Sequence, residues 1–146
     1  MFKFEKSTFI NQSPEEVFEF LTNPANDPKW RDSSISGEWT SAGPVGVGST
    51  QKTVGKIMGR EMESTSEVTV WDPSSEYGWK SVGGQIPFEA TQKFEAKEGG
   101  TQLTFSGQAE VEGFFKLAEG LVGKQLEKMM DKDMAGLKTY LEGSQE

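Results

Sequence analysis

The sequence contains neither cysteine nor histidine. Without cysteine the chain cannot form disulfides, thiolate nucleophiles or thiolate zinc sites. Without histidine it lacks the commonest general base near neutral pH and the commonest ligand of transition metals. Ser-His-Asp and Cys-His catalysis and HExxH zinc sites are therefore excluded. We expect no metal site and no cofactor, so any catalysis would depend on side chains such as carboxylates and tyrosine.

Positive charge is scarce as well. The chain has 15 Lys and Arg against 23 Asp and Glu, a formal net charge of −8, and its only arginines are Arg31 and Arg60. Nucleic-acid binding needs a basic surface, so we expect no nucleic-acid partner, and an anionic membrane surface would repel the chain. No stretch resembles a signal peptide or reaches the length of a transmembrane helix. We predict a cytoplasmic protein without an integral membrane segment.

The residues that are present favour a globular core. The hydrophobic share is 34%, but 17 glycines bring the apolar total close to the usual fraction, and 10 Phe and 4 Trp supply large side chains for a core or a pocket. A chain of 146 residues buries about 68–70% of its unfolded surface as one domain. We therefore predict a single domain over residues 1–146, as a monomer or homodimer.

The first part of the chain predicts one strand and two short helices. Residues 2–10 mix aromatic, β-branched and charged side chains over the length of a strand. Ser13 can cap a helix that starts at Pro14, and Glu16 completes a capping box. This helix is expected to end near Pro24, and residues 26–30 read as a second short helix or structured turn.

The middle of the chain predicts about six strands separated by turns rich in glycine, proline and aspartate. The clearest alternation of apolar and polar residues lies in residues 101–111 and is typical of an antiparallel strand covered on one face. The predicted strands are residues 35–40, 49–57, 60–71, 77–82, 88–96 and 101–111.

A long amphipathic helix is predicted for residues 114–142. Such a helix cannot bury its apolar face alone, so the strands must provide the surface against which it packs. Because strands and helices are segregated along the chain, the fold class is α+β with an antiparallel sheet. The predicted buried face of the helix comprises Ala118, Leu121, Val122, Gln125, Leu126, Met129, Asp133, Leu137 and Tyr140.

This order of elements resembles the START-like superfamily (SRPBCC), in particular its polyketide cyclase/dehydrase and lipid-transport branch. The resemblance covers nearly the whole chain, although each matching piece is short. It is carried by Ser13-Pro14-Glu15-Glu16-Val17-Phe18, Trp30, Val47-Gly48-Ser49, Val68-x-Val70-x-Asp72-Pro73, Trp79, Gly100-Thr101 and Leu137-Lys138-x-x-Leu141-Glu142.

The resemblance implies a helix-grip fold, in which a curved antiparallel sheet of about seven strands wraps around a long C-terminal helix and two short helices follow the first strand. It also implies an elongated apolar cavity between sheet and helix. Members of the superfamily bind or transfer lipids, sterols, polyketides and quinones, some cyclise or dehydrate polyketides, and others act with chaperones or in stress responses. The fold therefore does not define one function.

Candidate ligand-binding residues are those expected to face this cavity. Each of them has plain core packing as the alternative role. From the strands and turns they are Trp39, Val54, Met58, Val68, Val70, Trp79, Phe88, Phe94, Leu103 and Phe105, and from the helix Phe114, Ala118, Val122, Gln125 and Met129.

Two helix residues are candidates for catalysis, Asp133 and Tyr140. A carboxylate that faces a cavity has a raised pKa and can act as a general acid or base. The alternative for Asp133 is a position near the solvated end of the apolar face or an ion pair with a cation of the sheet. Gly120, Gly123 and Gly136 weaken a helix by about 1 kcal/mol each relative to alanine. They either leave room for a ligand or allow close packing on the sheet.

We favour binding, including transport, of a small hydrophobic ligand such as a lipid, a polyketide or a related metabolite, without catalysis. A cyclase or dehydratase that uses a cavity carboxylate or tyrosine and no metal is the first alternative. A co-chaperone-like or stress-related protein-interaction module is the second alternative, and it would need a large exposed apolar patch.

Overall fold

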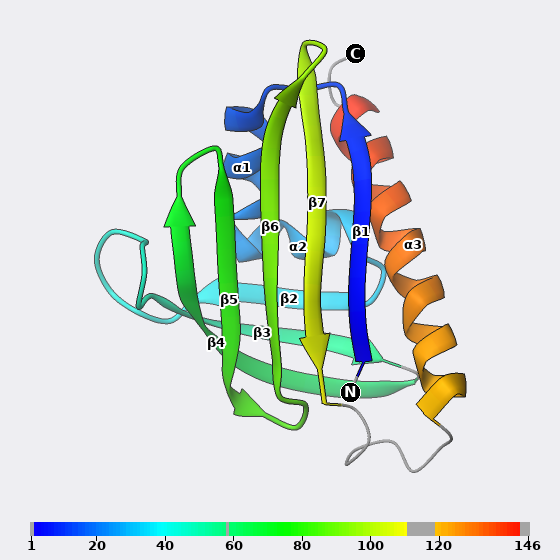
Figure 1. The fold of residues 1–146 in the computed structure, drawn as a ribbon. Helices are drawn as coiled ribbons and strands as arrows, with labels where there is room; N and C mark the ends of the chain where they lie inside the picture. Colours follow the sequence, from blue (N-terminus) through cyan, green and yellow to red (C-terminus); the bar gives the residue numbers. More distant parts are fainter. Residues whose placement is uncertain (1, 58, 111–118, 144–146) are drawn as a thin grey trace.

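The computed structural model describes residues 2–57, 59–110 and 119–143, and for residues 119–122 the backbone alone. A curled antiparallel sheet has α1 and α2 behind it and α3 alongside β1 (Figure 1). This arrangement confirms the predicted α+β helix-grip fold. The elements are β1 (Phe2–Ile10), α1 (Pro14–Leu21), η1 (Pro24–Asn26), α2 (Asp27–Trp30), β2 (Ser34–Trp39), β3 (Thr50–Ile57), β4 (Arg60–Asp72), β5 (Glu76–Gly84), β6 (Phe88–Lys97), β7 (Gly100–Ala109) and α3 (Glu119–Gly143).

The start of α1 agrees with the predicted cap. The Ser13 hydroxyl oxygen accepts the Glu16 backbone N–H at 3.3 Å, and the hydroxyl donates to the Glu16 carboxylate at 3.2 Å. The carboxylate thus contacts the capping hydroxyl, which differs from a standard capping box, where it accepts the backbone N–H of the cap. The chain then turns through η1 and α2, and Trp30 at the end of α2 is buried.

The seven strands pair in the order β1-β7-β6-β5-β4-β3-β2, and every pair is antiparallel. Pairing shifts register in β2 between Ser34 and Ser36 and twice in β4, after Thr65 and after Val68. Such irregularities bend a strand and increase its twist, so they help to curl the sheet. The curl gives the sheet a concave face, toward which its alternate side chains point.

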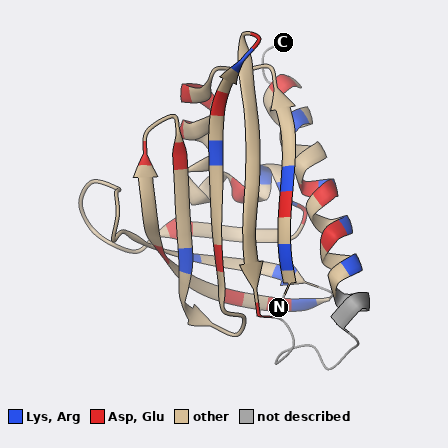
Figure 2. Cartoon of the chain, in the orientation of Figure 1, with Lys and Arg blue, Asp and Glu red and all other residues tan. Residues whose placement is uncertain are grey.

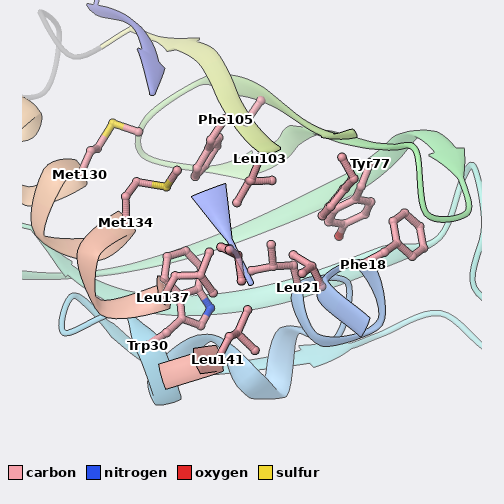
Figure 3. Packing of buried hydrophobic residues seen from close by; sticks show 14 of the residues in the cluster. Phe18, Leu21, Trp30, Tyr77, Leu103, Phe105, Met130, Met134, Leu137 and Leu141 are labelled. Atoms are coloured by element: carbon pink, nitrogen blue, oxygen red, sulfur yellow. The ribbon is translucent and has the colours of Figure 1, made fainter. Parts of the chain in front are cut away.

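The core lies between this concave face and the helices (Figure 3). Phe18 of α1 packs edge-on against Trp71 and Phe94, with ring centroids 5.2 and 5.3 Å apart. The helix α3 covers the other part of the face with a row of residues spaced three or four apart, as an amphipathic helix requires. The buried hydrophobic members of this row are Leu126, Met130, Met134, Leu137 and Leu141.

The buried face of α3 is rotated relative to the predicted one. Gln125 is exposed and Tyr140 is 39% exposed, whereas Met130, Met134 and Leu141, which the prediction left out, are buried. The reason is tertiary, because α3 packs against β1 and α2, and these contacts select which apolar row turns inward. The predicted residues 114–118 of this helix lie outside the described residues.

Charged residues of both signs mark β1 and the outer side of α3 (Figure 2). Lys6 of β1 forms ion pairs with Glu127 and Asp131 of α3, and Lys138 donates to the Phe9 carbonyl oxygen. Surface pairs of this kind contribute at most about 1 kcal/mol each, so apolar packing holds the helix in place. No helix within the described ranges has the length and apolar character needed to cross a membrane.

Candidate ligand-binding pocket

A pocket of about 260 Å³ lies between the concave face of the sheet and the helices α2 and α3. Most of its wall is apolar. The aromatic part forms a continuous series of ring contacts, in which Phe4 and Phe105 are 5.2 Å apart, Trp79 and Phe105 5.8 Å, and Tyr77 and Trp79 4.8 Å. The apolar lining residues include Phe2, Phe4, Leu21, Trp30, Val54, Ile57, Met62, Trp79, Ile86, Phe88, Ala90, Phe105, Leu126, Met129 and Met130.

Among the polar side chains of this wall, four buried ones lie on neighbouring strands. Gln51 of β3 lies opposite Ser66 of β4, and Tyr77 of β5 lies opposite Gln92 of β6. All four are buried and line the pocket. Because alternate residues of a strand point to one face, the sheet brings these groups to the same side. The Gln51 amide Nε2 donates to the Tyr77 hydroxyl at 2.9 Å.

Asp27, the first residue of α2, places a carboxylate in the pocket wall. Desolvation raises the pKa of Asp27 from 3.8 to about 6, and the nearby Arg31 charge opposes this shift. Asp27 forms no hydrogen bond or ion pair with another described side chain. Burial also raises the pKa of Tyr77, to which the Asp27 charge contributes. Asp27 can therefore exchange a proton near neutral pH, while Tyr77 stays protonated.

Arg31 connects the pocket wall to α3. Its Nε lies 3.2 Å from the Asp133 carboxylate, and its guanidinium lies 5.2 Å from the centre of the Trp30 ring. Burial raises the pKa of Asp133, and this effect exceeds the opposing influence of Arg31. Asp133 itself does not line the pocket. Asp133 is therefore ion-paired, but its partner Arg31 follows α2, whereas the predicted alternative was a cation of the sheet.

Two buried polar atoms of the wall have no hydrogen-bond partner among the described residues. They are the indole Nε1 of Trp30 and the amide Oε1 of Gln92. Trp30 is 6% exposed and Gln92 is 3% exposed, so neither side chain is open to bulk solvent. A buried polar atom without a partner is costly, and the few that occur in native proteins call for an explanation.

The predicted ligand-binding residues fall into four groups. Val54, Trp79, Phe88, Phe105 and Met129 line the pocket. Val68, Phe94 and Leu103 are buried in the core, and Trp39 packs against it, but none of these four lines the pocket. Val70 pairs with Gly78, which lies between the inward-facing residues Tyr77 and Trp79 and therefore on the other face of the sheet. Gln125 of α3 is exposed. Met58, Phe114, Ala118 and the side chain of Val122 lie outside the described residues.

The catalytic candidates do not reach the pocket. Asp133 is paired with Arg31, and Tyr140 packs on Phe20 at a ring distance of 5.2 Å near the surface. The pocket is instead lined by other carboxylates, Asp27, Glu63 and Glu89, and by a different tyrosine, Tyr77. No cluster of three or more potential metal-binding side chains occurs in the described part of the chain.

The sequence prediction missed the polar residues of the pocket. A weak signal existed for Gln92, because it stands between Ala90 and Phe94 at the two-residue spacing of an inward strand face. No comparable signal marked Asp27, since a carboxylate in the first turn of a helix is usually explained by the helix dipole. Its place in the wall depends on how α2 packs.

The glycines of α3 have different surroundings. A Cβ atom at position 136 would lie 2.7 Å from the Trp30 carbonyl oxygen, whereas one at position 123 would lie 3.8 Å from a ring carbon of Phe2. Close packing between α2 and α3 therefore accounts for Gly136. The side-chain surroundings of Gly120 lie outside the described residues.

Several solved structures share this fold. A START superfamily protein from Mycobacterium smegmatis aligns over 97% of both chains with a TM-score of 0.83 and 14% identity. A protein of Thermus thermophilus aligns over 99% of both chains with a TM-score of 0.81 and 18% identity. The di-domain ARO/CYC protein BexL from the BE-7585A biosynthetic pathway matches 97% of this chain with 47% of its own, at a TM-score of 0.75 and 14% identity. At these identities the likeness concerns the fold.

Among curated proteins, uncharacterized proteins of Mycobacterium bovis and Mycobacterium tuberculosis are 28% identical over 109 residues. The aligned part covers 70% of this chain and 62% of the relatives, so the match spans about six-tenths of their length. A profile of the family described as polyketide cyclase/dehydrase and lipid transport matches residues 1–142. The chain therefore belongs to the polyketide cyclase/dehydrase and lipid transport family.

Proposed function

We propose that the chain binds a small, mostly apolar ligand in the pocket between the concave face of the sheet and α3. The observation that carries this proposal is the wall itself, which combines continuous aromatic and methionine side chains with a few polar groups. Small-molecule sites typically have this composition, in which apolar surface gives affinity and a few polar groups fix orientation. The family and the fold support the same class of ligand.

The size of the pocket limits the ligand. Its volume of about 260 Å³ lies just below the range of about 300–1,000 Å³ that is common for small-molecule sites. The space suits a compact molecule of a few rings better than a long acyl chain. Met129 and Met130 of α3 are unbranched and can adapt their shape to an irregular ligand.

Binding of the neutral fluorescent probe N-phenyl-1-naphthylamine tests this proposal. The variant Ala90→Phe adds a ring to the wall, because Ala90 is buried and lines the pocket. Ala96→Phe is its matched control, since Ala96 lies on the same strand and is exposed. We expect saturable binding to the parent and to Ala96→Phe, and at least about tenfold weaker binding to Ala90→Phe. Equal affinity for both variants, with native circular dichroism, would place the probe elsewhere.

A second candidate function is proton transfer on the bound ligand, as in a cyclase or dehydratase. The observation that favours it is the carboxyl group of Asp27, whose pKa is raised to about 6 beside the protonated Tyr77. A general acid or base works best when its pKa is near the working pH. If such an activity exists, Asp27→Asn should lower kcat at least about 100-fold and leave ligand affinity nearly unchanged. An unchanged kcat would remove Asp27 from the reaction.

The interaction-module alternative has no specific support in the described residues. Their large exposed apolar side chains come from different parts of the chain: Ile35 from β2, Val47 from the loop before β3, Val82 from β5 and Tyr140 from α3.

A further inference from the structure

The polar part of the pocket wall contains a hydrogen-bond donor and hydrogen-bond acceptors that are left without partners among the described residues. We call it the polar subsite and define it as Asp27, Gln51, Tyr77 and Gln92. The Tyr77 oxygen accepts from Gln51, which leaves the hydroxyl hydrogen of Tyr77 available to donate. The Gln92 Oε1 is an acceptor without a partner among the described residues. The Asp27 carboxylate accepts no hydrogen bond from another described side chain.

Tyr77 and Gln92 are direct neighbours on adjacent antiparallel strands. Side chains in such a pair have Cβ atoms about 4.5–5.5 Å apart, so one small group can reach both of them. Among the described residues the Tyr77 hydroxyl is bonded to Gln51, and the Gln92 Oε1 has no partner. A hydroxyl group matches both needs at once, because it accepts one hydrogen bond and donates another.

The charges around the pocket favour an uncharged ligand. The charged lining residues are Asp27, Arg31, Glu63 and Glu89, three acids against one base. The single base is already engaged by the buried carboxylate of Asp133. A carboxylate placed in the polar subsite would meet two acceptors and the repulsion of Asp27, and it could donate no hydrogen bond in return.

From these observations we infer that the polar subsite binds a neutral hydroxyl group on a compact ring ligand and discriminates against the corresponding carboxylate. This inference rests on the proposed binding function and specifies its ligand. The hydroxyl accepts from Tyr77 and donates to Gln92, while the ring contacts the aromatic wall beside Trp79 and Phe105. Replacing the hydroxyl by hydrogen leaves Gln92 unpaired, and replacing it by a carboxylate adds repulsion.

Three probes with the same ring system test the inference: naphthalene, 2-naphthol and 2-naphthoate, titrated at about pH 8 and followed by NMR. We expect 2-naphthol to bind at least about fivefold more tightly than naphthalene, as one or two net hydrogen bonds would give. We expect 2-naphthoate to bind at least about tenfold more weakly than 2-naphthol. In Gln92→Leu the preference for 2-naphthol over naphthalene should fall below about twofold. Tyr77→Phe should also reduce this preference.

Asp27→Asn should reduce the discrimination against 2-naphthoate to less than about threefold. Asp72→Asn, at an exposed carboxylate at the end of β4, is the matched control and should leave the ratio unchanged. If naphthalene binds as tightly as 2-naphthol, or 2-naphthoate binds as tightly as either, the inference is wrong while the proposed function stands. If none of the three probes binds, the proposed function itself fails for ligands of this size.

Discussion

Replacing Asp27 by asparagine should stabilise the protein at neutral and alkaline pH. Asparagine keeps the shape of the side chain and removes the charge whose burial raises the Asp27 pKa from 3.8 to about 6. A raised pKa in the folded state means that folding favours the protonated form. The ionised carboxylate therefore costs stability above pH 6, and the cost disappears as the pH falls through 6 toward 4.

The size of the effect follows from the shift. A difference of about two pKa units corresponds to about 3 kcal/mol, because one unit equals 1.36 kcal/mol. At about pH 8 the free energy of unfolding of Asp27→Asn should exceed that of the parent by up to this amount, or by roughly 10 °C in Tm. At about pH 3.5 Asp27 is protonated in the folded state and mostly protonated in the unfolded state, so nearly all of the difference should vanish.

Urea unfolding of the two proteins at a series of pH values between about 3.5 and 8 measures this difference directly. Other carboxylates titrate in the same range, but they are common to both proteins and cancel in the comparison. Asp72→Asn, at an exposed position, is the control and should change stability by less than about 0.5 kcal/mol at every pH. A difference between Asp27→Asn and the parent that is independent of pH, or a destabilisation at pH 8, would refute the assignment of Asp27 as a desolvated carboxylate.

Two further predictions concern the contact between α2 and α3. Arg31→Met should destabilise the protein by about 2–3 kcal/mol, because it leaves the buried Asp133 carboxylate uncompensated. Asp133→Asn should destabilise it less. Urea unfolding that ranks the two variants in the opposite order would contradict this. Gly136→Ala should lower Tm, with a cost of about 1–3 kcal/mol from the clash with the Trp30 carbonyl oxygen outweighing the helix-propensity gain. Gly123→Ala has room for its methyl group and should raise stability by up to about 1 kcal/mol. If the two glycine variants change Tm by the same amount, close packing does not explain Gly136.

The fold could be predicted because its signals are local and repeat in sequence. The cap at Ser13, the turns between strands and the alternation in residues 101–109 each specify an element without reference to the rest of the chain. The rotation of α3 was less predictable. Met130 and Met134 lie next to the predicted face, and only the contacts with β1 and α2 decide which of the adjacent rows is buried.

The pocket could be predicted only in part, for a physical reason. Inward orientation on a strand follows from alternation, and Trp79 and Phe105, which were expected to face inward, line the pocket. Whether an inward residue reaches a pocket or fills the core depends on how far the sheet curls, and Leu103 is inward but fully buried in the core. Asp27 enters the wall through the packing of a four-residue helix, for which the sequence contains no periodic signal.

An NMR titration of the protein with 2-naphthol shows most directly whether the pocket is a ligand site. Trp30 lines the pocket and its indole Nε1 has no partner among the described residues, so its N–H resonance reports on occupancy. We expect a single saturable transition that moves this resonance and persists in Ala96→Phe, with affinity at least about tenfold weaker in Ala90→Phe. A titration that does not saturate, or that is unaffected by Ala90→Phe in a folded protein, would contradict the assignment of the pocket as a ligand site.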